Sequence, residues 1–212
     1  MSIVIVDCGS GETCKNDKAI VRRMIDELAA VDKHNHQVLL KWQLFTRVPS
    51  SVPPLDHDVY DFAVKYAEEK DYLTFASVFD YPSLAWLIGY NPPALKIACR
   101  PYLYHMLKDM PRELPIYVSI ADAGFAPLLK EMFPGHTMRM LYCVPDYPAI
   151  QTKYETLFGY NLSVGISDHS PDLRLFKEYQ PLWYERHYKL QDSDGLDAGQ
   201  HASTPEQLAE IL

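Results

Sequence analysis

The chain has 212 residues, of which 48% are hydrophobic and 23% are charged, and its net charge at pH 7 is −8. This composition suits one globular domain with a sizeable core, and an acidic chain without a basic block is a poor candidate for binding nucleic acid or an anionic membrane. We expect a cytoplasmic protein with reduced thiols, because the sequence has no membrane-spanning stretch, no basic leader before its first apolar run and no CxxC pair.

Short apolar runs alternate along the chain with segments of helical periodicity. We predict strands at 3–7, 37–43, 72–77, 94–99, 115–119, 138–143, 162–167 and 182–187. We predict helices at 18–31, 59–70, 82–89, 102–110, 125–133, 150–158, 173–179 and 205–212. Strand–helix alternation implies parallel strands with right-handed crossovers. Eight such repeats predict a compact (β/α)₈ TIM barrel as a single domain over residues 1–212.

Polar side chains stand at the carboxyl ends of most predicted strands. These ends carry Asp7, Lys41 with Gln43, Ser77, Lys96 to Cys99, Ser119, Ser167 to His169, and Glu185 to His187. A polar residue at one strand end means little, since strands must become loops. A whole ring of them predicts one convergent site, because barrels of this kind build their sites at that edge.

Two histidines follow the last two predicted strands, His169 after the seventh and His187 at the end of the eighth. Adjacent strands lie about 4.8 Å apart, so the two imidazoles can share one divalent metal. The alternative is that each histidine is a satisfied, partly buried side chain at a loop. The matched positions favour a metal site, and imidazole ligands suit Zn, Mn, Fe or Co without choosing among them.

Two lysines, Lys41 and Lys96, interrupt otherwise apolar strands. Lysine is seldom buried without a partner, so both either point into the barrel mouth or reach outward between helices. Strand alternation places Lys41 and Gln43 on one face and Trp42 on the other, which favours the inward position for Lys41. Two inward lysines would form a positive spot for an anionic ligand.

Serines end three of the predicted strands, and their hydroxyls can bind phosphate or carboxylate oxygens. They are Ser77, Ser119 and Ser167. Serine is common at strand ends, so each one is weak evidence by itself. The segment Gly9–Glu12 lacks the spacing of a Walker or Rossmann phosphate loop.

Six segments together resemble the sialic acid (N-acetylneuraminate) synthase family, which includes nonulosonate and spore-coat polysaccharide synthases. They are KWQLF (41–45), LTFASVFD (73–80), LKIAC (95–99), MLYCVPDYPA (140–149), VGISDHS (164–170) and ERHYKL (185–190). They occur in the order of the family and at nearly its spacing, and residues 195–212 resemble its acidic loop and following helix. VGISDHS together with ERHYKL is the most specific part.

The resemblance implies an enzyme that joins phosphoenolpyruvate to the aldehyde of an N-acylated amino sugar, with a divalent metal, usually manganese. By position, His169 and His187 would bind the metal, and Asp7 would act near the metal and water. Asp7, Lys41 and Tyr147 would be catalytic, and the substrate contacts would come from Lys41, Gln43, Ser77, Lys96, Cys99, Ser119, Ser167 and Asp197. Within that set the resemblance assigns the phosphoenolpyruvate carboxylate to both lysines and Ser77, and its phosphate to the other two serines. Tyr147 matches a site tyrosine and Asp197 the acidic residue that holds the sugar.

The chain departs from the family pattern at several of these positions. Asp7 replaces a glutamate, Cys99-Arg100-Pro101 replaces Ser-Gly-Glu, Ile120-Ala121 replaces Thr-Gly, and Pro145 replaces an asparagine near the phosphate. Proline cannot donate a backbone hydrogen bond. We also expect the C-terminal antifreeze-like domain of the family, which closes the sugar site across a dimer, to be absent. These changes fit a shifted substrate, or lost activity, better than an orthodox sialic acid synthase.

Three hypotheses follow. The first is a metal-dependent synthase that condenses phosphoenolpyruvate with a small aldehyde or sugar, and Arg100 could replace lost anion contacts there. The second is a pseudoenzyme or binding module on the same barrel. The third is a metal-dependent aldolase or isomerase of another class, because a fold does not determine a function. A homo-oligomer in which a neighbouring subunit closes the site is compatible with the first hypothesis.

Overall fold

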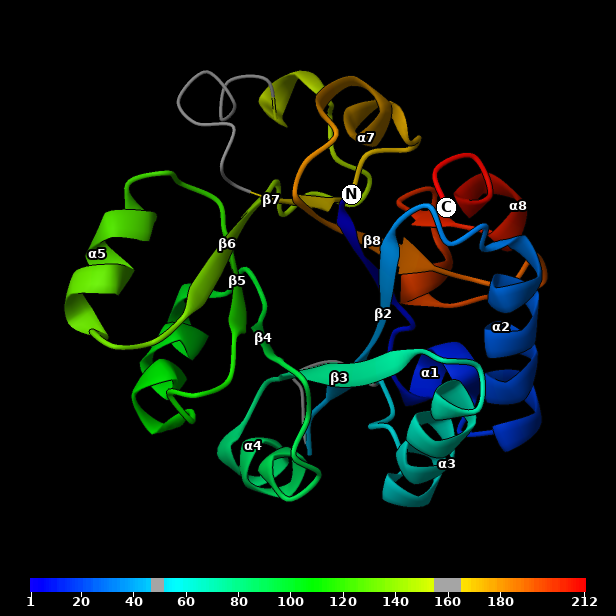
Figure 1. The fold of residues 1–212 in the computed structure, drawn as a ribbon, viewed down its shortest axis with the longest axis horizontal. Helices are drawn as coiled ribbons and strands as arrows, with labels where there is room; N and C mark the ends of the chain where they lie inside the picture. Colours follow the sequence, from blue (N-terminus) through cyan, green and yellow to red (C-terminus); the bar gives the residue numbers. More distant parts are fainter. Residues whose placement is uncertain (47–51, 155–164) are drawn as a thin grey trace.

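The computed structural model describes residues 1–46, 52–154 and 165–212. Eight parallel strands pair in chain order from β1 (Ile3–Asp7) onward, and β1 also pairs with β8 (Trp183–Tyr188). This last pairing closes the sheet into a barrel, with helices arranged around the strands (Figure 1). The predicted TIM barrel is confirmed.

The strands between these two follow the predicted positions closely. They are β2 (Gln37–Leu44), β3 (Leu73–Val78), β4 (Leu95–Ile97), β5 (Ile116–Ile120), β6 (Met138–Cys143) and β7 (Gly165–Asp168). The predicted start of the seventh strand, at 162–164, lies outside the described residues. A short ninth strand, β9 (Ala202–Ser203), was not predicted and pairs with β8 beyond the barrel proper.

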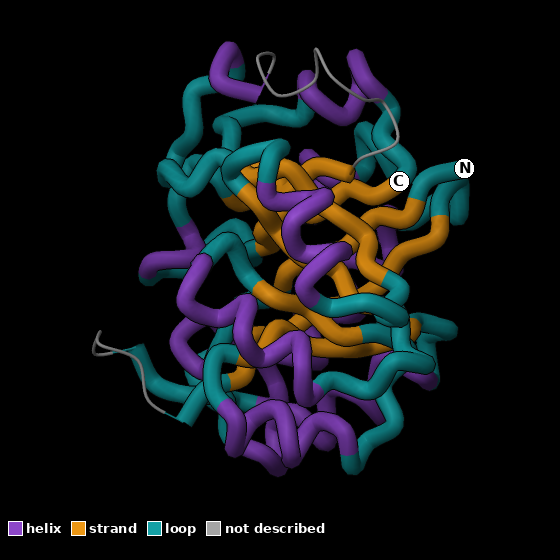
Figure 2. The backbone as a smooth tube through the Cα atoms, turned by 90° about the vertical axis from the view of Figure 1, so that its left-hand side faces the viewer, coloured by secondary structure: helices purple, strands orange, loops and turns teal. Residues whose placement is uncertain are grey.

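Helices cover the outside of the barrel, as the side view in Figure 2 also shows. They are α1 (Gly11–Cys14), α2 (Lys18–Val31), α3 (His57–Glu68), α4 (Tyr81–Ile88), α5 (Phe125–Met132), α7 (Arg174–Tyr179) and α8 (Pro205–Leu208). The predicted helix at 150–158 extends into residues that the structure does not describe. In the described part of the chain, no helix has the length and apolar character needed to cross a membrane.

The helix predicted at 102–110 is present, but it is a 3₁₀ helix, η1 (Pro101–Asp109), and not an α-helix. Its buried residues Leu103 and Met106, and likewise Tyr104 and Leu107, repeat every three positions. A 3₁₀ helix has three residues per turn, so this spacing places both pairs against the barrel. A second, shorter 3₁₀ helix, η2 (Leu196–Ala198), was not predicted.

The longest helix shows why the sequence forms these elements. In α2, Val21, Met24, Ile25 and Leu28 are buried on one face, at the spacing of an amphipathic helix. The carboxylate of Asp17 accepts a hydrogen bond from the backbone N–H of Ala19 at 2.7 Å and caps the helix. The helix is therefore bounded by its own sequence and docked by its apolar face.

Side-chain alternation gives the barrel interior two layers. The lower layer is apolar and consists of Ile5, Leu39, Phe75, Ala94, Tyr117 and Leu141. Two residues further along the same strands, the next inward positions are Asp7, Lys41, Ser77, Lys96, Ser119 and Cys143, joined by Ser167 and Glu185 of β7 and β8. The apolar layer thus closes the barrel beneath a polar floor.

Candidate active site

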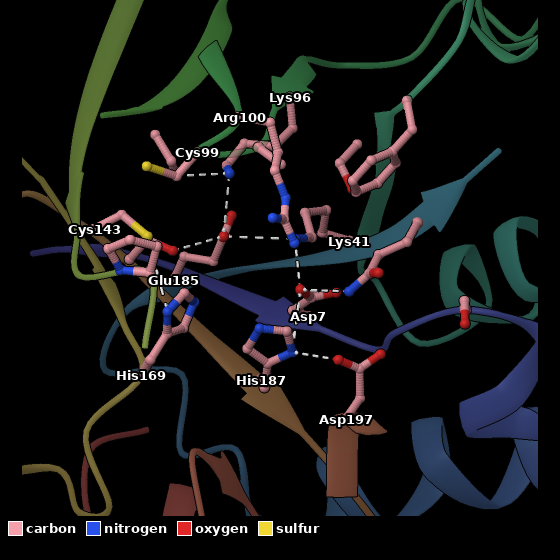
Figure 3. Close-up of a pocket in the computed structure, with 18 of the residues that line it drawn as sticks. Asp7, Lys41, Lys96, Cys99, Arg100, Cys143, His169, Glu185, His187 and Asp197 are labelled. Carbon is pink, nitrogen blue, oxygen red and sulfur yellow. Dashed lines mark hydrogen bonds and ion pairs between the residues drawn. The ribbon is translucent and has the colours of Figure 1, made fainter. Parts of the chain in front are cut away.

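A cavity of about 750 Å³ lies above this polar floor, at the carboxyl ends of the strands (Figure 3). All twelve residues that the sequence predicted for the site line it. They are Asp7, Lys41, Gln43, Ser77, Lys96, Cys99, Ser119, Tyr147, Ser167, His169, His187 and Asp197. The structure therefore brings the predicted residues together, whereas the role of each one stays a prediction.

A buried network of charges forms one side of the cavity. Lys41 Nζ lies 2.6 Å from Asp7 Oδ2 and 3.5 Å from Glu185 Oε1. Lys96 Nζ lies 3.2 Å from the same Glu185 oxygen and donates a hydrogen bond to Ser119 Oγ at 2.8 Å. Both lysines therefore point inward, and Glu185 lies between them.

Glu185 is a site residue that the prediction left out. Its Oε1 accepts a hydrogen bond from Ser167 Oγ at 3.0 Å, while its buried Oε2 has no hydrogen-bond partner among the described residues. The signal was present in the sequence, since Glu185 and His187 are two positions apart on one strand and face the same side. Glu185 therefore places a carboxylate with an unpaired oxygen where an anionic ligand would approach the two lysines.

The electrostatics of the network follow from burial and pairing. Burial alone would lower the pKa of Lys41, but Asp7 and Glu185 outweigh it and hold the pKa above its usual value. For Lys96 burial dominates and lowers the pKa, although Glu185 opposes the change. Burial raises the pKa of Glu185, but the two lysines bring it below its usual value. Lys41 and Glu185 are therefore held in their charged forms.

The opposite side of the cavity carries imidazole and carboxylate groups. The rings of His169 and His187, the predicted metal ligands, have their centroids 5.3 Å apart. The ring of Tyr147 stacks on His169 at 4.2 Å. His169 Nδ1 lies 2.8 Å from the carbonyl oxygen of Val144, so this carbonyl accepts from the ring and leaves Nε2 available.

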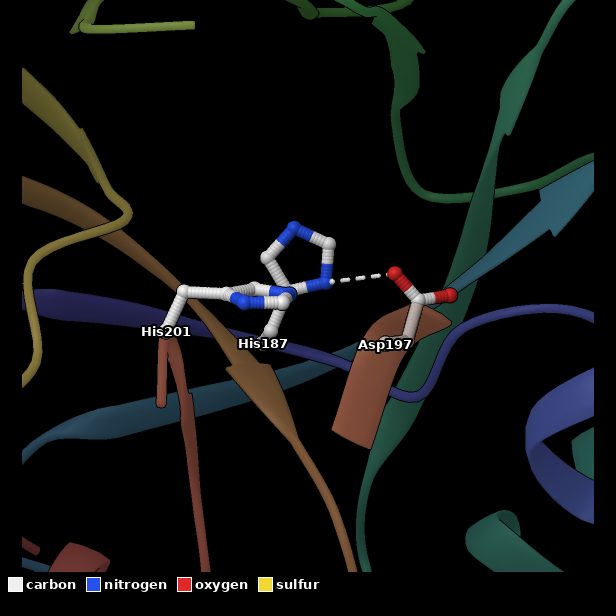
Figure 4. Close-up of side chains that lie close together, drawn as sticks. All are labelled: His187, Asp197 and His201. Carbon is white, nitrogen blue, oxygen red and sulfur yellow. Dashed lines mark ion pairs between the residues drawn. The ribbon is translucent and has the colours of Figure 1, made fainter. Parts of the chain in front are cut away.

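His201 is a third histidine at this side and was not predicted. One donor atom from each of His187, Asp197 and His201 lies within 4.8 Å of the other two (Figure 4). His201 Nε2 is buried and has no hydrogen-bond partner among the described residues, whereas the buried His187 Nδ1 faces Asp197 Oδ1 at 3.2 Å. Imidazole nitrogens and a carboxylate are donors that Mn, Fe, Co and Zn accept, so the residues present fit a divalent metal.

Protonation of the imidazoles differs around this group. Burial, and then the proximity of His187, hold the pKa of His169 well below its usual value and lower that of His201 to about 4. Burial would also lower the pKa of His187, but Asp7 and Asp197 outweigh it and raise the pKa. At neutral pH the structure therefore presents His169 and His201 as neutral imidazoles.

Four of the positions that depart from the expected pattern, Asp7, Cys99, Arg100 and Pro145, line the cavity, whereas Pro101, Ile120 and Ala121 do not. Asp7 accepts hydrogen bonds from Gln43 Nε2 at 3.1 Å and from the backbone N–H of Gly9 at 3.1 Å, in addition to its pairing with Lys41. Arg100 and Pro145 line the cavity beside Cys99. A hydrogen bond from Cys143 lowers the pKa of Cys99 to about 7. Burial opposes this change, and the nearby charge of Lys96 adds to it.

Comparisons with known proteins give structural likeness only, because neither the family models nor the curated protein sequences that we searched match this chain. N-Acetylneuraminic acid (sialic acid) synthetase from Leptospira borgpetersenii superposes with a TM-score of 0.78 at 24% identity, covering 98% of this chain and 80% of that one. Spore coat polysaccharide biosynthesis protein spsE from Bacillus subtilis gives 0.73 at 20%, covering 99% and 65%. DAHP synthase from Thermotoga maritima gives 0.70 at 10%, covering 99% and 66%. This chain thus has the barrel fold found in the sialic acid synthetase and in these other biosynthetic proteins.

Proposed function

We propose that this barrel is a metal-dependent synthase that condenses phosphoenolpyruvate with the aldehyde of a small sugar or related compound. One observation carries the proposal: Lys41 and Lys96 are buried at the floor of a cavity whose opposite side presents His169, His187 and Asp197. An anionic substrate and a metal-bound aldehyde could thus meet in one water-restricted space. The structural likeness to sialic acid synthetase and DAHP synthase supports this reaction class.

The lysine side of the cavity would bind phosphoenolpyruvate. The ammonium groups of Lys41 and Lys96, together with Ser77, would hold the carboxylate, and Ser119 and Ser167 would bind the phosphate. Glu185 Oε1 lies against both lysines and would have to share them with the incoming anion. The guanidinium of Arg100, which lines the same cavity, would add a positive charge to this end.

The imidazole side would bind the acceptor. A divalent metal there would polarise the aldehyde carbonyl. The acceptor would lie beside Asp197, and Tyr147, stacked on His169, would cover its carbon chain. Asp7 stands between the two ends, within 3.4 Å of His187 and 2.6 Å of Lys41, where it could take a proton from water.

The proposed reaction balances without a further reactant. Carbon 3 of phosphoenolpyruvate forms a bond with the aldehyde carbon, whose oxygen gains a proton. Water then attacks carbon 2, and inorganic phosphate leaves by cleavage of the C–O bond, which produces a 2-keto acid. The positive charge that develops at carbon 2 would face the carboxylates of Asp7 and Glu185.

The proposal is tested by calorimetric titration of phosphoenolpyruvate into the protein in the presence of Mn²⁺. We expect binding in the micromolar range, on the order of −8 kcal/mol. Lys96→Ala should weaken it at least about tenfold, because a charge-assisted contact to the anion is lost. Lys108→Ala is the control, since this lysine is on the surface and outside the cavity.

The two outcomes separate the hypotheses. Binding that depends on Lys96 would justify screening aldehydes for release of inorganic phosphate. Absence of binding at millimolar phosphoenolpyruvate would reject the synthase, and binding without phosphate release from any aldehyde would favour a pseudoenzyme.

A further inference from the structure

We propose that His201, together with Asp197, belongs to the metal site, so that the cation is bound by the strand-end histidines and also by the segment that follows β8. This inference rests on the proposed function for the metal requirement. The ligand set itself rests on the geometry of three residues, His187, Asp197 and His201. It adds two donors to the pair that the sequence predicted.

The spacing of the donors suits one cation. His187 Nδ1 lies 3.2 Å from Asp197 Oδ1, and metal bonds of about 2.1 Å place neighbouring ligand atoms about 3–4 Å apart. The ring centroids are 5.0 Å apart for His187 and His201 and 5.3 Å apart for His169 and His187.

One of these donors is buried without a partner. His201 is 3% exposed, and its Nε2 makes no hydrogen bond to any residue that the structure describes. A buried polar atom without a partner costs about 1–3 kcal/mol. His187 Nδ1 is also buried, and it faces Asp197 Oδ1 at 3.2 Å and Asp7 Oδ2 at 3.4 Å. A cation between His187, Asp197 and His201 would satisfy all three groups at once.

The chain holds His201 at this position through contacts with β8. Ala202 pairs with His187 in the β8–β9 ladder, which places His201 next to the strand end. Lys189 Nζ donates to the carbonyl oxygens of Ala198 at 2.7 Å and Gly199 at 3.0 Å and fixes the turn between Asp197 and His201. A Cβ at Gly199 would lie 2.8 Å from His201 Nδ1, so glycine is needed for the ring to fold back toward the site.

Asp197 is oriented in the same way. Its Oδ2 accepts a hydrogen bond from Thr13 Oγ1 at 3.3 Å, which leaves Oδ1 directed toward His187. Thr13 lies in α1, directly after the first strand. Thr13, from the other end of the chain, therefore orients the carboxylate of Asp197. Metal ligands are commonly oriented by such a hydrogen bond from a neighbouring residue.

The test measures metal binding in the absence of phosphoenolpyruvate, so that it does not depend on the reaction. Mn²⁺ is titrated into the metal-free protein and the free ion is followed by electron paramagnetic resonance, for wild type, His201→Ala, His187→Ala and Asp197→Asn. We expect each of these substitutions to raise the Mn²⁺ dissociation constant at least about tenfold. His34→Ala is the control, because His34 is exposed and outside the cavity.

A second measurement guards against loss of folding. His201→Gln preserves the size and polarity of the side chain but replaces a good ligand with a poor one, and thermal melts of the metal-free proteins would show whether it folds like wild type. With Co²⁺ as probe, its visible absorption should differ from that of wild type if an imidazole ligand has been lost.

The outcomes distinguish this inference from the proposed function. Wild-type affinity for Mn²⁺ and an unchanged Co²⁺ spectrum in folded His201 variants would overturn the assignment of His201, while a loss confined to His187→Ala would leave the metal-dependent synthase intact. If wild type binds no Mn²⁺, Co²⁺ or Zn²⁺ at millimolar concentration, the ligand set and the metal requirement both fail. Tight metal binding without any binding of phosphoenolpyruvate would retain the site and reject the synthase.

Discussion

Asp7 makes four contacts at the end of β1. It pairs with Lys41, accepts from Gln43 and from the backbone of Gly9, and lies 3.4 Å from His187. It therefore joins the lysine side of the cavity to the imidazole side. The short side chain keeps this carboxylate against Lys41.

The thiol of Cys99 ionises more readily than that of an ordinary cysteine. Its pKa is lowered to about 7 by a hydrogen bond from Cys143 and by the charge of Lys96, which together outweigh the effect of burial. A thiolate forms as the pH rises through the pKa, and the thiolate is the nucleophile. Alkylation of Cys99 by iodoacetamide, followed by peptide mass spectrometry, should therefore accelerate with a midpoint near pH 7.

Cys143→Ala provides the comparison for this prediction. Removing the hydrogen-bond donor should shift the alkylation midpoint of Cys99 upward, toward the value of about 8.5 for a free thiol. An unchanged midpoint in the variant would show that Cys143 does not stabilise the thiolate. Cys8 should remain unreactive in both proteins, because burial holds its pKa well above the usual value.

At the scale of the elements, the close packing of β7 between its neighbours depends on a residue without a side chain. A Cβ at Gly165 would lie 2.4 Å from Leu141 Cδ2 and 2.5 Å from the carbonyl oxygen of Trp183. We expect Gly165→Ala to lower the free energy of unfolding by about 1–3 kcal/mol, since β6 or β8 must move to admit the methyl group. Urea denaturation measures the change.

The matched control is Gly124→Ala. There the added Cβ would meet only the exposed side chain of Asp122, whose nearest atom is Oδ1 at 3.3 Å and which can move, and the backbone is already helical. We expect a change within about 0.5 kcal/mol. Equal stability of the two variants would show that β7 has room to relax.

The last elements are joined through a buried ion pair. Arg186 of β8 donates to the carbonyl oxygen of Ser170 at 2.5 Å and to Ser203 Oγ at 2.9 Å, and its Nη1 lies 3.5 Å from Asp168 Oδ2. The side chain thus connects β7, β8 and β9. These contacts hold β9, and with it the turn that carries His201, against the barrel.

At the scale of the whole molecule, the chain carries a net charge of −8, and the cavity supplies no excess of positive charge to offset it. Three cations face four carboxylates, so the formal charge of the cavity is slightly negative. They are Lys41, Lys96 and Arg100 against Asp7, Glu12, Glu185 and Asp197. A multiply charged anion entering this cavity would therefore make it strongly negative, and charges confined in a buried site are weakly screened.

The charge balance predicts that phosphoenolpyruvate binding requires the divalent cation. Removing the metal with a chelator and repeating the calorimetric titration should weaken binding at least about tenfold, or about 1.4 kcal/mol. Adding Mn²⁺ back should restore it. Equal affinity in the chelated protein would mean that the lysines and Arg100 bind the anion unaided.

The sequence alone predicted the barrel and twelve of the residues that line its cavity. Residues two apart on a strand face the same side, and the strand ends of a parallel barrel meet at one edge, so inward positions such as Lys41 and Ser77 could be placed before the structure was known. The limits of α2 were predicted correctly for the same reason, because its cap and apolar spacing are local. Glu185 was placed at one of these strand ends, but no role was predicted for it.

The tertiary structure decided the features that depend on contacts between distant segments. His201 lies beside His187 only because a two-residue strand pairs with β8, and no local pattern signals so short a ladder. Asp197 is aimed by Thr13 from the other end of the chain. Local periodicity reports which side of its own element a residue faces, whereas the distance between donors on separate segments is set by how the closed barrel packs.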